Sequence, residues 1–298
     1  MTEIVPKAAE ALLTWQGLLA ALEAGHRLPL SDIKDMFLYR GQDTILDRGA
    51  WIDGLGALVK VATIFPGNAA KGLPTIYGVV SLFDDVTGDL AALVDFHLVT
   101  KWKTAGDSLL SASRLARKDS RKFLLVGAGA VARSMVEAYS SVFPEARFTV
   151  WSRTRESAEA MGLPVADDLE AAVRRADVIC SATMATAPLI KGDWLQPGQH
   201  IDLIGAYKPG MREVDDRAMA RARVFVDSRA TTLHHIGELM DPIASGAISE
   251  ADVVADFYDD PAFYARRSED EITIAKNGGG AHLDLMTASY IADCWRKR

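Results

Sequence analysis

Cysteine is scarce in this chain of 298 residues, which contains only Cys180 and Cys294. Such a pair predicts neither a disulfide framework nor a thiolate metal site. Cys180 falls within the apolar strand pattern DVICSAT, which indicates a buried thiol. His234 and His235 are adjacent, so their side chains diverge and do not form a ligand pair. We therefore expect no metal site.

An excess of positive charge and long apolar runs are also lacking. The chain has 33 Lys and Arg against 40 Asp and Glu, a formal net charge of −7. This balance argues against nucleic acid or an anionic membrane as the principal partner. No apolar run reaches the roughly 20 residues needed to span a bilayer, and the start MTEIVPKAAEALLTW lacks the features of a signal peptide. We expect a cytoplasmic protein that acts on a small molecule.

The first third of the chain has the pattern of an antiparallel sheet. A short helix over residues 12–25 precedes five strand-like runs between residues 36 and 100, which are MFLYRG, TILDRGAWIDG, ALVKVATIF, TIYGVVSLF and LAALVDFHLV. The segment FDDVTGD has turn chemistry and predicts a hairpin of the last two runs. From Thr104, the segment TAGDSLLSASRLARKDS predicts a helix that leads into a second domain.

From Phe123 onward, strand and helix patterns alternate, which predicts a parallel sheet covered by helices. The turn VGAGAVA fits the pattern G-x-G-x-x-A at Gly127, Gly129 and Ala132, directly after the first strand. Gly127 permits the tight turn, Gly129 allows the backbone to approach a pyrophosphate, and the helix start offers free N–H groups to it. The pattern therefore predicts a dinucleotide site, with a purely structural turn as the alternative.

The end of the second strand of this domain indicates which dinucleotide is preferred. An NAD site usually has Asp or Glu there, whereas TVWSRT offers Ser152, Arg153 and Thr154. Arg153 can pair with a 2′-phosphate to which the two hydroxyls can donate. We expect NADP(H) to be preferred, with NAD(H) as a second cofactor; the alternative is that Arg153 is an ordinary surface side chain.

One lysine interrupts the apolar strand LGALVKVATIFPGN. An unpaired ammonium in an apolar interior costs several kcal/mol, so Lys60 either lies on an exposed strand face or faces a cleft in which a bound ligand compensates its charge. The residues alone leave these alternatives open.

Five segments, in order along almost the whole chain, carry a resemblance to a known family. They are KVATIFPGNAAKGLPTIYG, WKTAGDSLLSASRLARKDS, GAGAVA, IGAYKPGMREVDD and EITIAKNGGGAHLD. Together they resemble the ornithine cyclodeaminase/mu-crystallin family. The resemblance implies a Rossmann dinucleotide-binding domain over residues 120–277 and a discontinuous α+β substrate-binding and dimerisation domain over residues 1–119 and 278–298. It also implies a homodimer.

The resemblance assigns roles to several polar residues. The family holds the substrate carboxylate between a lysine and an arginine beside the nicotinamide; Lys60 matches the lysine, and Arg40 in LYRG matches an upstream arginine. Lys103 in WKTAG replaces the family's usual arginine, and Thr75 is expected to orient the imine side of the substrate. Tyr207 in IGAYKPG stands where ornithine cyclodeaminases and alanine dehydrogenases usually carry an aspartate.

Strand positions and the resemblance together imply a set of cofactor contacts at strand ends and in glycine turns. The set is Thr104, Gly127, Ala128, Gly129, Ala130, Val131, Ser152, Arg153, Thr154, Ala182, Thr183, Met184, Gly205, Ala206, Asp227, Asn277 and Gly279. His282 follows the expected cofactor loop and is interpreted either as a neighbour of the site or as a packing residue.

The tyrosine at position 207 favours imine reduction over amino-acid oxidation. Oxidation requires a base for the substrate ammonium, and a phenol, which holds its proton up to about pH 10, serves poorly. The segments GAYKPGMREVDD and WKTAGDS resemble the branch that reduces 1-pyrroline-2-carboxylate and 1-piperideine-2-carboxylate to L-proline and L-pipecolate. We expect this activity, with Lys60 and Tyr207 as the catalytic residues and the proton donor left open. The alternatives are an ornithine cyclodeaminase or related amino-acid dehydrogenase, and an NADP-bound mu-crystallin-like binding protein.

Overall fold

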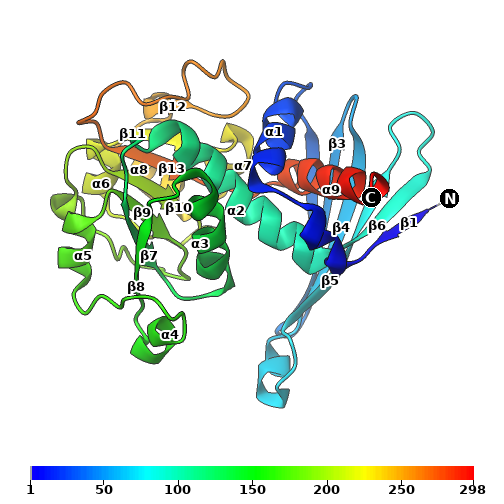
Figure 1. Ribbon diagram of the computed structural model, residues 1–298, viewed down its shortest axis with the longest axis horizontal. Helices are drawn as coiled ribbons and strands as arrows, with labels where there is room; N and C mark the ends of the chain where they lie inside the picture. Colours follow the sequence, from blue (N-terminus) through cyan, green and yellow to red (C-terminus); the bar gives the residue numbers. More distant parts are fainter. Residues whose placement is uncertain (1) are drawn as a thin grey trace. The chain divides into compact units, whose positions relative to one another are not determined.

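The computed structural model describes residues 2–298, which divide into two compact units (Figure 1). The first unit contains the chain up to Lys103 and the C-terminal segment Gly280–Arg298, and the second is Thr104–Gly279. The C-terminal segment therefore belongs to the same compact unit as the N-terminal part of the chain. The expected boundary at residues 119 and 120 stands after the long helix α2 (Phe96–Leu115), whereas the compact units divide within it.

The first unit contains a six-stranded sheet in the order β1-β6-β5-β4-β3-β2. Neighbouring strands from β2 to β6 pair antiparallel, and β1 joins β6 in parallel. Its strands are β1 (Glu3–Val5), β2 (Asp32–Arg40), β3 (Asp43–Ile52), β4 (Gly56–Ile64), β5 (Ile76–Phe83) and β6 (Leu90–Asp95). The predicted hairpin is confirmed, because β5 and β6 pair across a turn in which the Asp84 carboxylate accepts the N–H groups of Val86 and Thr87.

Helix α9 (Ala281–Arg296) lies against one face of this sheet, beside α1 (Trp15–Gly25) (Figure 1). Short 3₁₀ helices, η1 (Lys7–Leu12) and η2 (Pro66–Lys71), complete the unit. Burial alternates along β4, so that Leu58, Lys60 and Ala62 are buried on one face. This period-two alternation is that of a strand with one covered face.

Helix α2 begins at Phe96, eight residues before the expected start at Thr104. The apolar run FHLV was expected to continue strand β6. Instead, the Asp95 carboxylate accepts the N–H of Leu98 at 2.8 Å, which is the bond of a helix N-cap. A side-chain cap therefore ends the strand where apolar character alone does not.

The second unit is built on a seven-stranded sheet in the order β12-β11-β13-β10-β9-β7-β8, in which every neighbouring pair is parallel. The strands are β7 (Lys122–Val126), β8 (Arg147–Trp151), β9 (Val178–Ser181), β10 (His200–Leu203), β11 (Arg223–Val226), β12 (Val253–Ala255) and β13 (Thr273–Lys276). Its helices are α3 (Ala130–Val142), α4 (Arg155–Glu159), α5 (Leu169–Arg175), α6 (Asp216–Arg221), α7 (Arg229–Thr232) and α8 (Gly237–Ala244), with 3₁₀ turns η3 (Gly192–Trp194) and η4 (Glu250–Asp252). The predicted Rossmann-type parallel sheet is confirmed.

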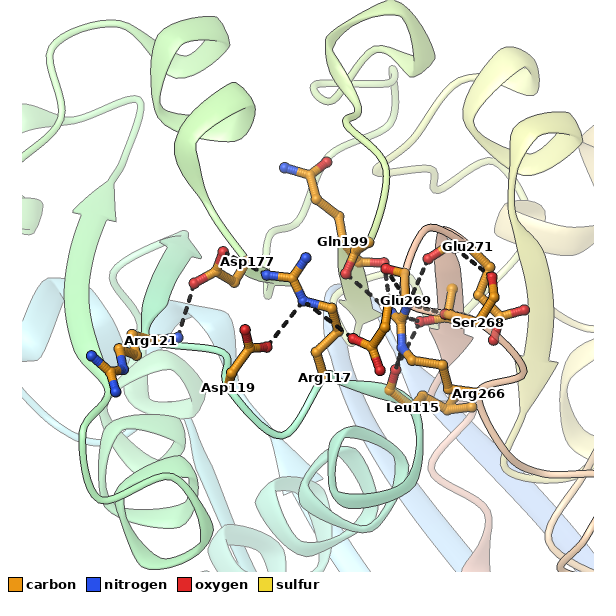
Figure 2. A network of polar contacts seen from close by, with 12 residues as sticks. Leu115, Arg117, Asp119, Arg121, Asp177, Gln199, Arg266, Ser268, Glu269 and Glu271 are labelled. Atoms are coloured by element: carbon orange, nitrogen blue, oxygen red, sulfur yellow. Dashed lines mark hydrogen bonds and ion pairs between the residues drawn. The ribbon is translucent and has the colours of Figure 1, made fainter.

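A polar network fixes the amino ends of these strands (Figure 2). The Arg266 guanidinium donates to the carbonyls of Leu115 and Glu271, each at 2.7 Å. Asp177, directly before β9, accepts the N–H groups of Arg121 and Lys122, each at 2.9 Å. Because the strands are parallel, this leaves their carboxyl ends, including the glycine turn after β7, together at the opposite edge.

No helix within residues 2–298 combines the length and apolar character needed to cross a membrane.

Candidate active site

Lys60 points from β4 toward the face that α9 covers and is only 5% exposed. Its Nζ donates to Asp284 Oδ1 at 2.7 Å and to Thr100 Oγ1 at 2.8 Å, and it lies 4.7 Å from the centroid of the Phe96 ring. Thr100 donates its own hydrogen to the Phe96 carbonyl, so its oxygen is oriented to accept from the ammonium. The lysine in the apolar strand is thus buried and paired with a carboxylate of its own chain.

Asp284 is fully buried in α9, and its second oxygen lies 3.9 Å from Nη1 of Arg48. Burial alone would raise the pKa of Asp284, but the charges of Lys60, Lys103 and Arg48 hold it below its ordinary value. Burial lowers the pKa of Lys60 to about 8; Lys103 and Arg48 act in the same direction, whereas Asp284 opposes them. The pair is therefore ionised at neutral pH, and the lysine loses its proton only slightly above it.

Arg48 on β3 completes this charged cluster. In the sheet register, Arg48 stands opposite Lys60 on one side and opposite Asp35 on the other. Its Nε and Nη2 bind the two oxygens of Asp35 at 3.0 and 2.9 Å, so the guanidinium is held in a two-point contact. Its side chain is 20% exposed.

The structure does not bring Arg40 to Lys60. Arg40 is the last residue of β2, where its side chain is 79% exposed and pairs with Asp43 at 2.9 Å. Because side chains alternate along a strand, Arg40 lies on the opposite sheet face from Asp35, and hence from Arg48 and Lys60. The tight turn that pairs Ile52 with Gly56 is the sequence feature that could have indicated Arg48, since it sets residues 48 and 60 opposite each other.

The other expected substrate residues occupy three different environments. Lys103 is 7% exposed in the first unit, and its charge acts on the pKa values of both Lys60 and Asp284, so it belongs to the cluster. Thr75 is half-buried before β5, and its carbonyl accepts the N–H of Phe65 at 2.8 Å. Tyr207 belongs to the second unit and is 56% exposed.

His282 lies in the first unit and is fully buried in α9. Its ring packs edge-on against that of His26, with centroids 5.6 Å apart. Burial, reinforced by His26 and Lys103, lowers the pKa of His282 well below its usual range, so the ring is neutral. This corresponds to the packing interpretation.

The second unit contains a cavity of about 460 Å³ at the carboxyl ends of β7, β8 and β9. The expected cofactor residues that line it are Gly127, Ala128, Gly129, Ser152, Arg153, Thr154, Ala182, Thr183 and Met184. Gly127 has φ 108°, and a Cβ there would lie 2.7 Å from the Ala182 carbonyl oxygen, so this turn requires glycine. A Cβ on Gly129 would meet nothing within 4 Å, and Gly129 caps α3 without a side-chain bond. Open space before bare helix N–H groups suits a pyrophosphate.

The remaining expected cofactor residues border this edge or support it. Ala130 and Val131 begin α3, and Gly205 and Ala206 follow β10. The Asn277 side chain donates to the carbonyl of Thr104 at 3.3 Å. Asp227 is buried and accepts the Gly279 N–H at 2.8 Å. The side chains of Asn277 and Asp227 are therefore engaged in holding the NGG turn. Within residues 2–298, no three His, Cys, Asp or Glu side chains gather closely enough to hold a metal ion.

Comparisons with known proteins agree with this architecture. The model of the ornithine cyclodeaminase/mu-crystallin family matches residues 53–298. The Delta(1)-pyrroline-2-carboxylate reductase of Paracoccus denitrificans is 54% identical over 296 residues, covering 95% of this chain and 94% of its own. The Thermococcus litoralis Delta(1)-pyrroline-2-carboxylate reductase, solved with NADH and L-proline, has a TM-score of 0.88 at 24% identity, covering 99% and 98% of the two chains. An archaeal alanine dehydrogenase dimer with bound NAD has a TM-score of 0.88 at 26% identity, covering 99% and 96%.

Proposed function

This chain belongs to the ornithine cyclodeaminase/mu-crystallin family, and we propose that it is an NAD(P)H-dependent reductase of a cyclic ketimine carboxylate. The substrate is 1-pyrroline-2-carboxylate, which gives L-proline, or 1-piperideine-2-carboxylate, which gives L-pipecolate. The observation that carries the proposal is the buried cationic cluster around Lys60, together with the relative of the same activity at 54% identity.

The cluster suits a ligand with one carboxylate. It brings the cations Arg48, Lys60 and Lys103 together with the carboxylates of Asp35 and Asp284. An ammonium has three hydrogens, and Lys60 gives two of them to Asp284 and Thr100. The substrate carboxylate accepts the third, with Arg48 as the second cation.

The reaction places few demands on protein side chains beyond holding the substrate. The bound nicotinamide supplies a hydride to the imine carbon, and the π electrons of the C=N bond move to nitrogen as a lone pair. A ketimine that is already protonated on nitrogen needs no further proton for this step. Lys60 and Arg48 therefore contribute by orienting the substrate carboxylate. This fixes the position of the ring carbon to which the carboxylate is attached. A tyrosine at position 207 is compatible with this reaction, because imine reduction requires no carboxylate base at that position.

We assign a preference for NADPH to the side chains at the end of β8. Arg153 and Thr154 are exposed on the cavity wall, and no Asp or Glu lines this cavity. A guanidinium there favours the additional phosphate of NADPH, whereas ribose hydroxyls of NADH gain no carboxylate partner. NADH remains a second, weaker donor.

A homodimer accounts for the exposed outer face of the first unit's sheet. Met36, Leu38, Ile45, Tyr77 and Val79 are between 37% and 53% exposed in the single chain, and β2 is an edge strand. By strand alternation and register, these side chains lie on the face opposite Lys60. Exposed apolar side chains gathered on one sheet face that extends to an edge strand mark a contact surface, and a second copy of the chain is the proposed partner.

The deciding experiment follows the loss of nicotinamide absorbance when the purified protein is mixed with NADPH and 1-pyrroline-2-carboxylate. L-Ornithine with NAD is the parallel reaction, in which ammonia is measured. Oxidation of NADPH with L-proline as product and no ammonia from ornithine is the expected result. Ammonia and proline from ornithine would instead identify a cyclodeaminase, and inactivity in both reactions would favour the binding-protein alternative.

A further inference from the structure

The buried carboxylate of Glu213 joins two turns at the carboxyl ends of neighbouring strands. Its Oε1 accepts the Ser181 hydroxyl at 2.6 Å and both the N–H and the hydroxyl of Thr183 at 2.8 Å, and its Oε2 accepts the Gly205 N–H at 2.7 Å. Ser181 ends β9, and Gly205 follows β10. Glu213 is 0% exposed, so water does not compete for these four bonds.

A second buried carboxylate holds the backbone of Glu213. Glu238 in α8 accepts the N–H of Glu213 at 2.8 Å and that of Val214 at 3.0 Å. Burial and the charge of Glu213 raise the pKa of Glu238 to about 7, and Lys276 opposes this shift. The buried Lys276 ammonium donates to the carbonyl of Leu203, the last residue of β10, at 2.9 Å. The carboxyl ends of β9 and β10 are thus held by the side chains of Glu213 and Lys276, and Glu213 is itself held by Glu238.

Thr183 connects the Glu213 carboxylate to the cavity that the glycine turn at Gly127 lines. Its hydroxyl hydrogen goes to Glu213, and its methyl carbon lies 3.4 Å from where a Cβ on Gly127 would stand. Both residues line the cavity. The turns that follow β9 and β10 are also in close contact, because a Cβ on Gly205 would lie 2.0 Å from the Thr183 carbonyl oxygen. A displacement of Thr183 therefore changes the wall next to the dinucleotide motif.

We propose that Glu213 is a positioning residue of the dinucleotide site, which acts through Thr183 and Gly205. The proposal rests on the proposed function, since it takes the cavity to hold a nicotinamide dinucleotide. The four groups that contact this carboxylate, which come from Ser181, Thr183 and Gly205, are all hydrogen-bond donors, so both carboxylate oxygens are needed as acceptors. The amide of a glutamine would direct its NH₂ group at one of them, and one turn would lose its partner.

The test is calorimetric titration of NADPH into the wild type and Glu213→Gln, with Glu145→Gln as the matched control. Glu145 belongs to the same unit, and its side chain is 67% exposed. We expect the Kd for NADPH to rise about tenfold or more in Glu213→Gln and to stay within about twofold in the control. In steady-state assays, the KM for NADPH should rise while the KM for the imine changes less than about twofold.

Thr183→Val serves as the milder variant if Glu213→Gln does not fold, because valine removes only the hydroxyl bond and keeps the N–H. It should raise the Kd for NADPH about threefold or more. Folded variants with a lowered Tm but an unchanged Kd would overturn the positioning role. Failure of the wild type to bind NADPH would instead refute the proposed function on which it rests.

Discussion

Asp284→Asn removes the carboxylate that pairs with Lys60 and keeps nearly the same side-chain shape. In the wild type, burial, Lys103 and Arg48 lower the pKa of Lys60 to about 8, and Asp284 is the opposing charge. An opposite charge at 2.7 Å typically stabilises the ionised form by roughly one to three pH units. The pKa of Lys60 should therefore fall by about this amount in the variant.

The sign of the effect on activity follows from which form binds substrate. Only the ammonium form of Lys60 attracts the substrate carboxylate, so kcat/KM should fall as pH rises through the pKa of Lys60. With a downward shift of about two units, the charged fraction at pH 7 drops from about nine-tenths to about one-tenth. We expect kcat/KM at pH 7 to fall about tenfold and the alkaline limb of the profile to move to lower pH.

The assay is the pH profile of kcat/KM for imine reduction in the wild type, Asp284→Asn and Asp293→Asn. Asp293 lies on the same helix, with its side chain 56% exposed, and serves as the control. The imine titrates identically in all three reactions, so a displacement between the profiles belongs to the protein. An alkaline limb that stays in place in Asp284→Asn, with the protein folded, would refute the assignment of this limb to Lys60.

Three further substitutions test separate parts of the account. Arg48→Ala should lower kcat/KM for the imine roughly thirtyfold, which corresponds to about 2 kcal/mol, whereas Arg40→Ala should change it less than about twofold. A larger loss in Arg40→Ala than in Arg48→Ala would restore the assignment of Arg40. Arg153→Ala should raise the KM for NADPH about fivefold or more and leave that for NADH nearly unchanged; equal effects would make Arg153 an ordinary surface residue. Leu38→Asp should shift the mass measured by light scattering from dimer to monomer, and a stable dimer would exclude this face as the interface.

The dinucleotide-binding unit was predicted well, because short contiguous segments of the sequence encode its main features. The glycine turn, the apolar strands and the strand ends at Ser152 and Ala182 each follow from a few adjacent residues. Parallel strands bring those ends to one edge, and the structure places them around one cavity. The support by Glu213 was missed, because its bonds join residues 181, 183, 205 and 213 through loops that no short pattern describes.

The charged cluster of the first unit was only partly predictable. Lys60 stood out because an ammonium in an apolar strand needs compensation. Its partner Asp284 is 224 residues away in sequence, on a helix whose buried face contains other polar residues. Arg40 was expected beside Lys60 from family resemblance alone, whereas the strand register, which decides the face that a side chain occupies, places Arg48 opposite Lys60.

The central claim is that Lys60 holds the carboxylate of an imine that NADPH reduces. The most direct measurement compares kcat/KM for NADPH-dependent reduction of 1-pyrroline-2-carboxylate by the wild type, Lys60→Ala and the exposed control Lys71→Ala. The account predicts a loss of about 2–4 kcal/mol in Lys60→Ala, roughly thirtyfold to a thousandfold, and almost none in the control. A folded Lys60→Ala protein that loses less than about threefold would contradict it.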